Sequence, residues 1–195
     1  IGLNATFAKM TANGGNLALV SQSGAMCSAV LDWAKSNQVG FSSVISLGMT
    51  ADVDFGQILD YLIYDKRTHY ILRYDEGIRN ARRFMSALRS AARIKPIILL
   101  KAGRHEAGAM ATATHSGMAA VSDTVFDAAV RRAGVVRVQN VGQLFYAAKA
   151  LASKFRPLGN RLAIITNGGG PGAMAADRAG DLGIPLAQLS QETMA

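Results

Sequence analysis

The sequence predicts a doubly wound α/β protein whose sheet is mainly parallel. Short apolar runs of strand length alternate along the chain with longer stretches of helical periodicity. Such alternation favours a parallel sheet with helices packed on both faces. Ligands of these sheets bind outside the carboxyl ends of the strands, so the loops that follow the strands are the candidate functional segments.

Each element follows from the local pattern. The apolar runs predicted as strands are residues 16–21, 42–47, 69–74, 96–101, 134–138 and 161–166. The helical patterns lie at residues 25–37, 55–64, 78–93, 123–133, 140–153 and 173–181. Residues 102–114, AGRHEAGAMATAT, are rich in glycine and alanine and are expected to form a mobile loop. Ser122 or Asp123 is expected to cap the helix that follows it.

Length and composition limit the class of protein. The chain has 195 residues, of which 50% are hydrophobic, enough for one or two domains. No apolar run approaches the roughly 18 to 20 residues that span a bilayer, and no secretory signal is visible. Cys27 is the only cysteine, which excludes an internal disulfide and a cysteine-rich zinc site. We therefore expect a cytoplasmic protein with no membrane partner and no bound metal. Because the sequence starts at Ile1 and not at an initiator methionine, we also expect it to be a piece of a longer chain.

The formal net charge of +8 raises the question of an anionic partner. Much of the excess lies in RNARRFMSALRSAAR, residues 79–93, on a predicted helix. We interpret these arginines as a solvated helix face, or as one covered by an acidic domain elsewhere in the protein. Interleaved aromatic residues, zinc-finger spacing and heptads are lacking beside them, so no nucleic-acid partner is predicted.

An internal repeat divides the chain. GNLALVSQSGAM at 15–26 and GNRLAIITNGGGPGAM at 159–174 share a Gly-Asn entry, an apolar strand, a polar residue and a glycine-rich turn, with Gly-Ala-Met expected to open a helix. Residues 154–160, which contain proline and glycine, are interpreted as a linker between two similar domains. Residues 161–195 would then begin a second domain, with IPLAQL (184–189) as its next strand.

Both repeated loops are candidate phosphate sites. A glycine-rich turn between a strand and a helix directs several unpaired N–H groups at one point, with the helix dipole behind them. The candidate phosphate-binding residues are Ser21, Ser23 and Gly24 in the first loop and Asn167, Gly168, Gly169 and Gly170 in the second. Neither loop matches a nucleophile elbow, a Walker loop or a dinucleotide fingerprint, and a tight turn without ligand is the alternative.

One of the three histidines stands apart from the others. His115 lies in ATATHSGMAA among small residues that offer little to pack against, whereas His69 and His105 show no comparable setting. Glu76 follows the strand at 69–74, and a carboxylate beside one imidazole nitrogen fixes the tautomer and makes the other nitrogen more nucleophilic. The two residues are therefore a candidate catalytic pair, with a solvent-exposed loop histidine as the alternative.

Several motifs in their order resemble one known superfamily. NLALVSQSGAM, SLGMTADVDFGQILDYL, YDEGI, KAGR, THSGMAAVSD and TNGGGPGAMAAD are similar to segments of the NDP-forming acyl-CoA synthetases. These include succinyl-CoA synthetase and the ADP-forming acetyl-CoA synthetase. The resemblance covers nearly the whole chain and implies a flavodoxin-like fold and an acid-thiol ligase activity.

The resemblance also implies a role for each candidate residue. In that family phosphate attacks an acyl-CoA, and a histidine carries the phosphoryl group from the acyl phosphate to ADP. The family's phosphohistidine matches His115 and its orienting glutamate matches Glu76. Its phosphate-facing helix ends match the loops at 21–24 and 167–172, and Gly117 joins the phosphate-binding residues. The implied ligands are CoA or acyl-CoA, phosphate, and ADP or ATP with Mg²⁺.

The same resemblance implies a domain plan. The expected parts are 1–14, the tail of a preceding CoA-binding domain; 15–153, a succinyl-CoA synthetase-like domain; 154–160, a linker; and 161–195, the start of a second flavodoxin-like domain, truncated. CoA-binding and ATP-grasp domains are expected in the same protein or in a partner subunit. A homo-oligomer is also possible. The chain alone is not expected to turn over, because nucleotide would bind mainly outside it.

A closer resemblance suggests an alternative function. DVDFGQILDYL, KRTHYIL, RRFMSALRSAARIKPIILLKAGR and DAAVRRAGVVRVQNVGQLF are similar to bacterial Pat-type protein lysine acetyltransferases. Those proteins fuse this region to a GNAT domain, and some have lost the histidine and use the region to sense acetyl-CoA. The alternative is therefore a non-catalytic acetyl-CoA sensor. This chain retains His115, which favours preserved phosphoryl chemistry, and Thr114 before it matches the acetate-type branch of the synthetases. Arg73 departs from the expected pattern, because it is a charged residue in a strand that is expected to be buried.

Overall fold

The structure is a computed structural model that describes residues 8–9, 11–50, 52–116, 121–153 and 157–194, with only the backbone described at 115, 116 and 194. The chain divides into two compact units, residues 1–154 and residues 155–195. Within the described residues, the first unit holds a five-stranded sheet and helices α1 to α6, and the second holds α7 and α8.

The sheet has the strand order β2-β1-β3-β4-β5, and every pairing between neighbouring strands is parallel. The strands are β1 (Asn13–Ser21), β2 (Gly40–Ser46), β3 (Tyr70–Asp75), β4 (Ile97–Lys101) and β5 (Val136–Val138). The prediction of a flavodoxin-like, doubly wound α/β fold is confirmed. In this order the winding reverses between β1 and β3, which places the ligand crevice of such sheets at the ends of these two strands.

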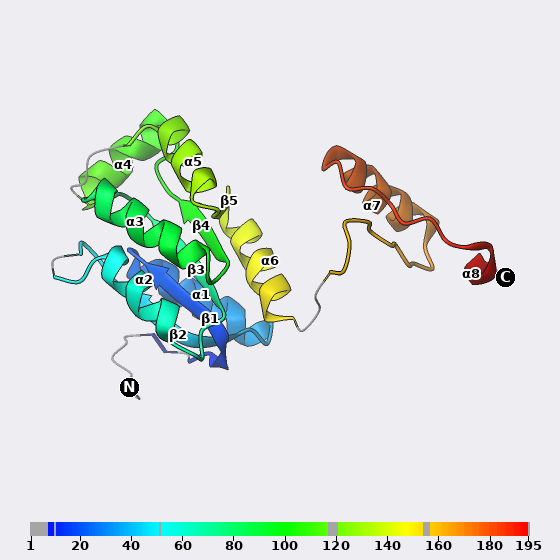
Figure 1. The fold of residues 1–195 in the computed structure, drawn as a ribbon, viewed down its shortest axis with the longest axis horizontal. Helices are drawn as coiled ribbons and strands as arrows, with labels where there is room; N and C mark the ends of the chain where they lie inside the picture. Colours follow the sequence, from blue (N-terminus) through cyan, green and yellow to red (C-terminus); the bar gives the residue numbers. More distant parts are fainter. Residues whose placement is uncertain (1–7, 10, 51, 117–120, 154–156, 195) are drawn as a thin grey trace. The chain divides into compact units, whose positions relative to one another are not determined.

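Helices cover both faces of the sheet (Figure 1). Their bounds are α1 (Gly24–Ser36), α2 (Phe55–Tyr64), α3 (Ala81–Ala92), α4 (Glu106–Ser116), α5 (Asp123–Arg132) and α6 (Val141–Ala152). Ala18 and Val20 of β1 pack in the same core as α2, α3 and α5, whereas Leu17 and Leu19 pack with α1 and α6. Alternate residues of a strand point to opposite faces, so β1 is buried on both sides.

Most predicted boundaries agree with the structure to within three residues, because polar side chains mark the helix starts. Asp54 and Gln57 form a reciprocal capping box at the start of α2, and Asn80 caps α3. At α5 one of the two expected capping residues, Ser122, occupies the cap position, but its side chain makes no capping hydrogen bond. The acidic Asp123 in the first turn instead complements the helix dipole there.

The prediction of a loop over residues 102–114 holds for residues 102–105 but was wrong from Glu106 onward, because α4 spans Glu106–Ser116. Its alanines and its methionine are strong helix formers, and an acidic Glu106 begins the first turn. The helix lacks a clear apolar face, so periodicity gave no signal for it. His115 therefore lies in the last turn of a helix, and Gly117 lies outside the described residues.

The second unit differs from its prediction in both expected strands and at its helices. Residues 161–166 do not form a strand: they make a single parallel bridge, Leu162 to Leu186, because a strand requires a ladder of hydrogen bonds with a neighbour. The predicted strand at 184–189 takes part in that same bridge. Helix α7 (Gly169–Asp181) begins four residues earlier than expected, and a short α8 (Gln191–Met194) follows.

Candidate functional site

Three strands end side by side at the carboxyl edge of the sheet. Ser21 at the end of β1 is in register with Tyr74 of β3, and Asp75 of β3 is in register with Lys101 at the end of β4. The backbone continues this pairing by one more bond, since the Gln22 N–H donates to the Tyr74 carbonyl at 3.1 Å. The loops after β1, β3 and β4 therefore leave the sheet from one edge.

The first predicted phosphate loop is a hydrogen-bonded turn at the start of α1. The Ser21 hydroxyl donates to the Ser23 carbonyl at 2.9 Å and accepts from the Ser23 N–H at 3.0 Å. The Ser23 hydroxyl in turn accepts from the Met26 N–H at 3.2 Å as the helix cap. Both serine side chains thus build the turn, which leaves the amides of Gly24 and Ala25 at the open helix end. No acidic residue lies in this first turn, so an anion would meet only the positive end of the helix dipole.

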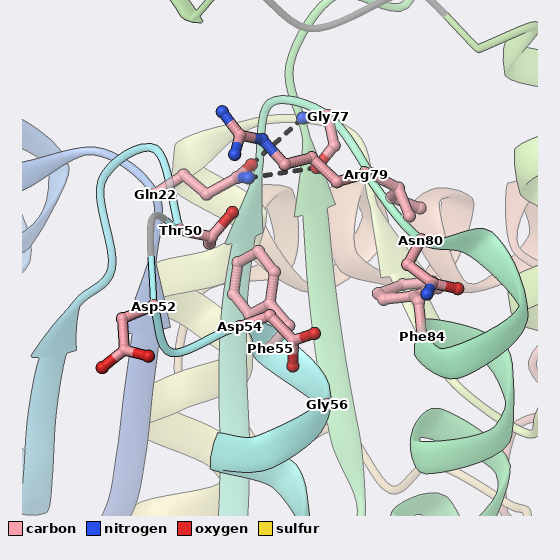
Figure 2. A pocket seen from close by; sticks show the side chains of 11 residues that line it. Gln22, Thr50, Asp52, Asp54, Phe55, Gly56, Gly77, Arg79, Asn80 and Phe84 are labelled. Atoms are coloured by element: carbon pink, nitrogen blue, oxygen red, sulfur yellow. Dashed lines mark hydrogen bonds between the residues drawn. The ribbon is translucent and has the colours of Figure 1, made fainter.

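Gln22, which sequence reasoning did not select, joins this turn to the loop after β3. Its buried side-chain oxygen accepts from the N–H groups of both Glu76 and Gly77. Its nitrogen donates to the Gly77 carbonyl at 3.0 Å, and Figure 2 shows the two bonds with Gly77. Gln22 also lines a cavity of about 120 Å³ with the aromatic rings of Phe55 and Phe84. The predicted phosphate loop and the predicted glutamate are therefore held together.

Glu76 is half-buried and lies next to Tyr74. Burial, followed by the charge of Glu76 and a hydrogen bond with it, raises the pKa of Tyr74. The Tyr74 phenol can therefore donate a hydrogen bond to the Glu76 carboxylate.

Helix α4 packs directly on the turn after β4. Gly103 has φ of 68°, and a Cβ at this position would lie 2.7 Å from Oγ1 of Thr112. Thr112 and Glu76 line one small cavity together with Lys101. His115 follows Thr112 by three residues, so its backbone lies one turn further along the same side of α4. The structure thus brings α4 to Glu76, while the imidazole lies outside the described atoms.

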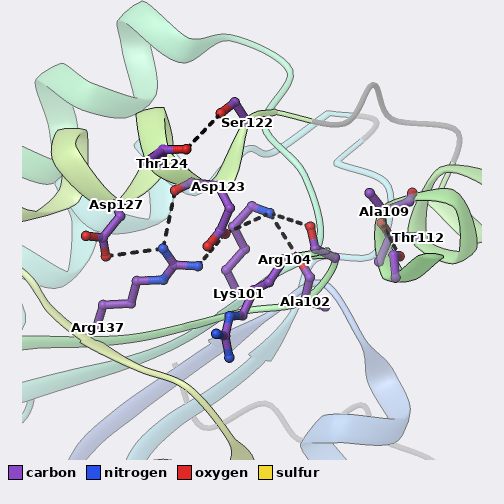
Figure 3. A network of polar contacts seen from close by, with 12 residues as sticks. Lys101, Ala102, Arg104, Ala109, Thr112, Ser122, Asp123, Thr124, Asp127 and Arg137 are labelled. Carbon is purple, nitrogen blue, oxygen red and sulfur yellow. Dashed lines mark hydrogen bonds and ion pairs between the residues drawn. The ribbon is translucent and has the colours of Figure 1, made fainter. Parts of the chain in front are cut away.

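Lys101 shapes the entry into α4 (Figure 3). Its buried ammonium group donates to the carbonyls of Ala102 and Gly103 at 3.1 and 3.0 Å and lies 3.7 Å from a carboxylate oxygen of Asp123. Burial lowers the pKa of Lys101; the Asp123 carboxylate opposes this effect, and the nearby Arg137 adds to it. Arg137 itself donates to the carboxylates of Asp123 and Asp127, so α5 is tied to both β4 and β5.

The second predicted phosphate loop repeats the hydrogen bonds of the first. Thr166 donates to the Gly168 carbonyl and accepts from the Gly168 N–H, as Ser21 does with Ser23. Gly168 occupies the cap position of α7 and has no side chain to cap the helix. A capping side chain is not needed there, because the third helical residue is Pro171, which has no N–H group. Asn167 lies within this turn, and Gly169 and Gly170 open α7 with free space around each. Gly169 therefore corresponds to Gly24, and Gly-Ala-Met at 172–174 lies inside the helix rather than at its start.

Arg73, the charge in β3 that the sequence did not explain, forms a buried ion pair with Asp75. Arg73 is fully buried and donates to both carboxylate oxygens of Asp75, at 2.7 and 2.9 Å. Its guanidinium carbon lies 3.9 Å from the ring centre of Phe55 and 4.7 Å from that of Phe84. Aromatic faces attract cations, so the two rings compensate part of the cost of burial.

The described residues contain no group of three or more His, Cys, Asp or Glu side chains that could hold a metal ion. None of the helices in the described ranges is long and apolar enough to cross a membrane.

Comparison with known proteins places this architecture in a family. Residues 14–151 match the family described as the succinyl-CoA ligase like flavodoxin domain. The chain is 46% identical over 194 residues to "Acetate--CoA ligase [ADP-forming] I" of Archaeoglobus fulgidus, covering all of this chain and 28% of that protein. It is 44% identical over 184 residues to "Acetate--CoA ligase [ADP-forming] I subunit alpha" of Pyrococcus furiosus, covering 94% of this chain and 40% of that subunit.

A solved structure agrees with the same assignment. The dinucleotide forming acetyl-coenzyme A synthetase 1 of Ca. Korarchaeum cryptofilum, in complex with phosphate and ADP, superposes with a TM-score of 0.89 at 38% identity. The match covers 97% of this chain and 41% of that one, so this chain spans between 28% and 41% of the length of these three relatives. The chain belongs to the succinyl-CoA ligase like flavodoxin domain family.

Proposed function

We propose that the chain is the central phosphohistidine module of an ADP-forming acyl-CoA synthetase, an acid-thiol ligase. In this proposal His115 carries a phosphoryl group between an acyl phosphate and ADP, and the acyl group is acetyl or another short chain. The names of the relatives, acetate–CoA ligases of archaea, support this substrate class.

One observation carries the proposal: Glu76 lies between the open end of α1 and helix α4. Gln22 ties the Glu76 backbone to the turn that begins α1, and Glu76 shares a cavity with Thr112 of α4. An anion at the Gly24 and Ala25 amides would then be close to the carboxylate that orients a histidine on α4. A carboxylate in that position holds the imidazole N–H on one side and leaves the other nitrogen as the nucleophile.

The proposed steps balance as follows. A phosphate oxygen attacks the acyl carbonyl carbon, the C–S bond breaks, and CoA leaves as its thiol with the proton released by phosphate. A neutral imidazole nitrogen of His115 attacks phosphorus, the bridging P–O bond breaks, and the carboxylate leaves. A terminal oxygen of ADP then attacks the same phosphorus, the N–P bond breaks, and ATP and the neutral imidazole result. Each step is reversible, and preformed amide donors stabilise the charge on the transferred group.

The remaining ligands would be bound by other parts of the full protein. CoA would bind a domain that precedes residue 15, and ADP with Mg²⁺ would bind an ATP-grasp domain of the same protein or of a partner subunit. The amides of Gly169 and Gly170 at α7, where the first turn also lacks an acidic residue, are proposed as the second phosphate site. Gly117 is proposed to add a backbone donor beside His115.

The overall reaction provides the first test. Full-length protein is supplied with acetyl-CoA, phosphate, ADP and Mg²⁺, and ATP formation is followed with a luciferase assay. We expect ATP in the wild type, none in His115→Asn, and at least about tenfold less in Glu76→Gln because the imidazole loses its orienting carboxylate. Acetyl-CoA binding without ATP formation in the wild type would contradict the proposal and favour the acetyl-CoA sensor inferred from the Pat-type resemblance.

A further inference from the structure

We infer that Gln22 is a positioning residue that sets Glu76 against the phosphate-binding end of α1. This inference rests on the proposed function and adds to it a residue that acts through Glu76. The structural basis is a set of three hydrogen bonds between one buried side chain and the backbone of a loop 55 residues away.

The contacts join both ends of the Gln22 amide to the backbone of the loop. The N–H groups of Glu76 and Gly77 both donate to the same side-chain oxygen, and the Gly77 carbonyl accepts from the side-chain nitrogen. A neutral amide supplies both an acceptor and a donor at this length, whereas a carboxylate cannot donate and methionine offers only a weakly accepting sulfur. The side chain is 7% exposed, so water does not readily replace these bonds.

The position of Gln22 in the chain gives the contact its consequence. It lies between Ser21 and Ser23, whose hydroxyl groups build the turn before α1, and its own N–H is bonded to β3. Its backbone is therefore fixed to the phosphate loop and its side chain to the glutamate loop. These two loops follow β1 and β3, where the winding of the sheet reverses.

The test compares phosphorylation of His115 in full-length variants. Gln22→Met keeps the length and removes all three bonds, and Gln22→Asn keeps the amide but is one methylene too short to make them together. Single-turnover phosphorylation from acetyl-CoA and phosphate is expected to slow by about 10- to 100-fold in both, since small misplacements of catalytic groups have effects of this size. Gln143→Met is the matched control, because it removes a glutamine side-chain acceptor on α6 and should leave the rate unchanged.

A double-mutant cycle separates positioning from a general structural role. If Gln22 acts through Glu76, adding Gln22→Met or Gln22→Asn to Glu76→Gln slows phosphorylation less than threefold further. Hydrogen exchange at the amides of Glu76 and Gly77 should also accelerate in the Gln22 variants, while that of Leu72 in β3 stays unchanged. If Gln22→Met does not fold, Gln22→Asn carries the test.

The outcomes distinguish this inference from the proposed function. Additive effects of Gln22 and Glu76 variants, in a protein whose His115 is phosphorylated, would overturn the inference and leave the proposed function intact. An unchanged rate in both Gln22 variants would do the same. Absence of phosphate on His115 in the wild type would overturn the proposed function and this inference with it.

Discussion

At the residue scale, the entry into α4 depends on a glycine. Gly103 combines a positive φ of 68° with an approach so close that an added Cβ would lie 2.7 Å from Thr112 Oγ1 and 3.3 Å from the Cα of Ala109. The backbone of α4 therefore rests on the turn that Lys101 holds through its carbonyls. Only glycine satisfies both the conformation and the contact.

We predict that Gly103→Ala destabilises the protein more than Gly134→Ala does. Gly134 has φ of 79° but open space around it, so its substitution costs only the left-handed conformation, about 1–2 kcal/mol. Gly103→Ala adds the displacement of α4 and should also slow His115 phosphorylation. Urea unfolding of the two variants measures the difference; equal losses would show that the contact with α4 has no energetic weight.

The residues of the site differ in how far the sequence predicts them. Glu76 and Ser23 follow strands directly, so their place at the carboxyl edge can be predicted from the strand pattern alone. Gln22 bonds to a loop 55 residues away, and a local pattern does not distinguish it from an exposed glutamine. Ser21 was expected to face a ligand, yet its hydroxyl is used within the turn, because two hydrogen bonds to Ser23 are available at shorter range.

At the scale of elements, β3 carries a buried ion pair in the layer between the sheet and helices α2 and α3. Arg73 and Asp75 are 0% and 1% exposed, and the Arg73 Nε and Nη1 atoms have no hydrogen-bond partner among the described residues. The pair and the two aromatic rings above it connect β3 to the starts of α2 and α3. Removing one charge leaves the other without compensation.

We predict that Arg73→Met lowers the free energy of unfolding by about 3–5 kcal/mol, because Asp75 then remains as a buried unpaired carboxylate. The double variant Arg73→Met/Asp75→Leu should recover a large part of this loss, since it removes both charges. Thermal unfolding followed by circular dichroism tests the pair. A double variant less stable than Arg73→Met would contradict this account of the pair.

The contact between α5 and β5 should depend on pH. The pKa of Asp123 is lowered: burial alone would raise it, but the hydrogen bond and charge of Arg137, with Lys101 and Arg104, outweigh burial. A carboxylate with a lowered folded pKa stabilises the fold fully above its unfolded value of about 3.9 and loses this effect as the pH falls through the lower folded value. Arg137 is 4% exposed, so this pair is poorly screened by solvent.

We predict that Arg137→Met costs about 1–3 kcal/mol at pH 7 and that this cost shrinks as the pH falls below about 3.9, because Asp123 takes up a proton. Arg131→Met is the control, since Arg131 is 76% exposed in its pair with Asp127 and should cost less than about 0.5 kcal/mol. Urea unfolding at several pH values provides the measurement. A cost for Arg137→Met that grows toward acid pH would contradict the stabilising role assigned to the ionised Asp123 carboxylate.

The elements themselves were mostly predictable, and the exceptions have physical causes. The five strands of the sheet and the helices between them follow from apolar periodicity and from caps such as Asp54 and Asn80. Helix α4 was missed because alanine and glycine were interpreted as loop residues and the helix has no apolar stripe. The strand expected at 161–166 is absent because an apolar run becomes a strand only when a neighbour pairs with it.

At the scale of the whole molecule, the two units differ in how much of their surface they bury. The first unit has two cores, one on each face of its sheet. Among the described residues of the second unit, Ala179 is the only buried apolar side chain, and Ile165 is 97% exposed. The repeated turn at Thr166 and Gly168 nevertheless forms with the hydrogen bonds of the first unit, so the local geometry of this loop does not require a surrounding core.

The central claim is that His115 accepts a phosphoryl group, and it can be measured directly. Full-length protein is incubated with acetyl-CoA, phosphate and Mg²⁺ but without nucleotide, and peptides are analysed by mass spectrometry for an acid-labile, alkali-stable phosphate. We expect this phosphate on His115 in the wild type, at a lower level in Glu76→Gln, and not at all in His115→Ala. Acetyl-CoA binding with no phosphate on His115 would contradict the account and identify the module as an acyl-CoA sensor.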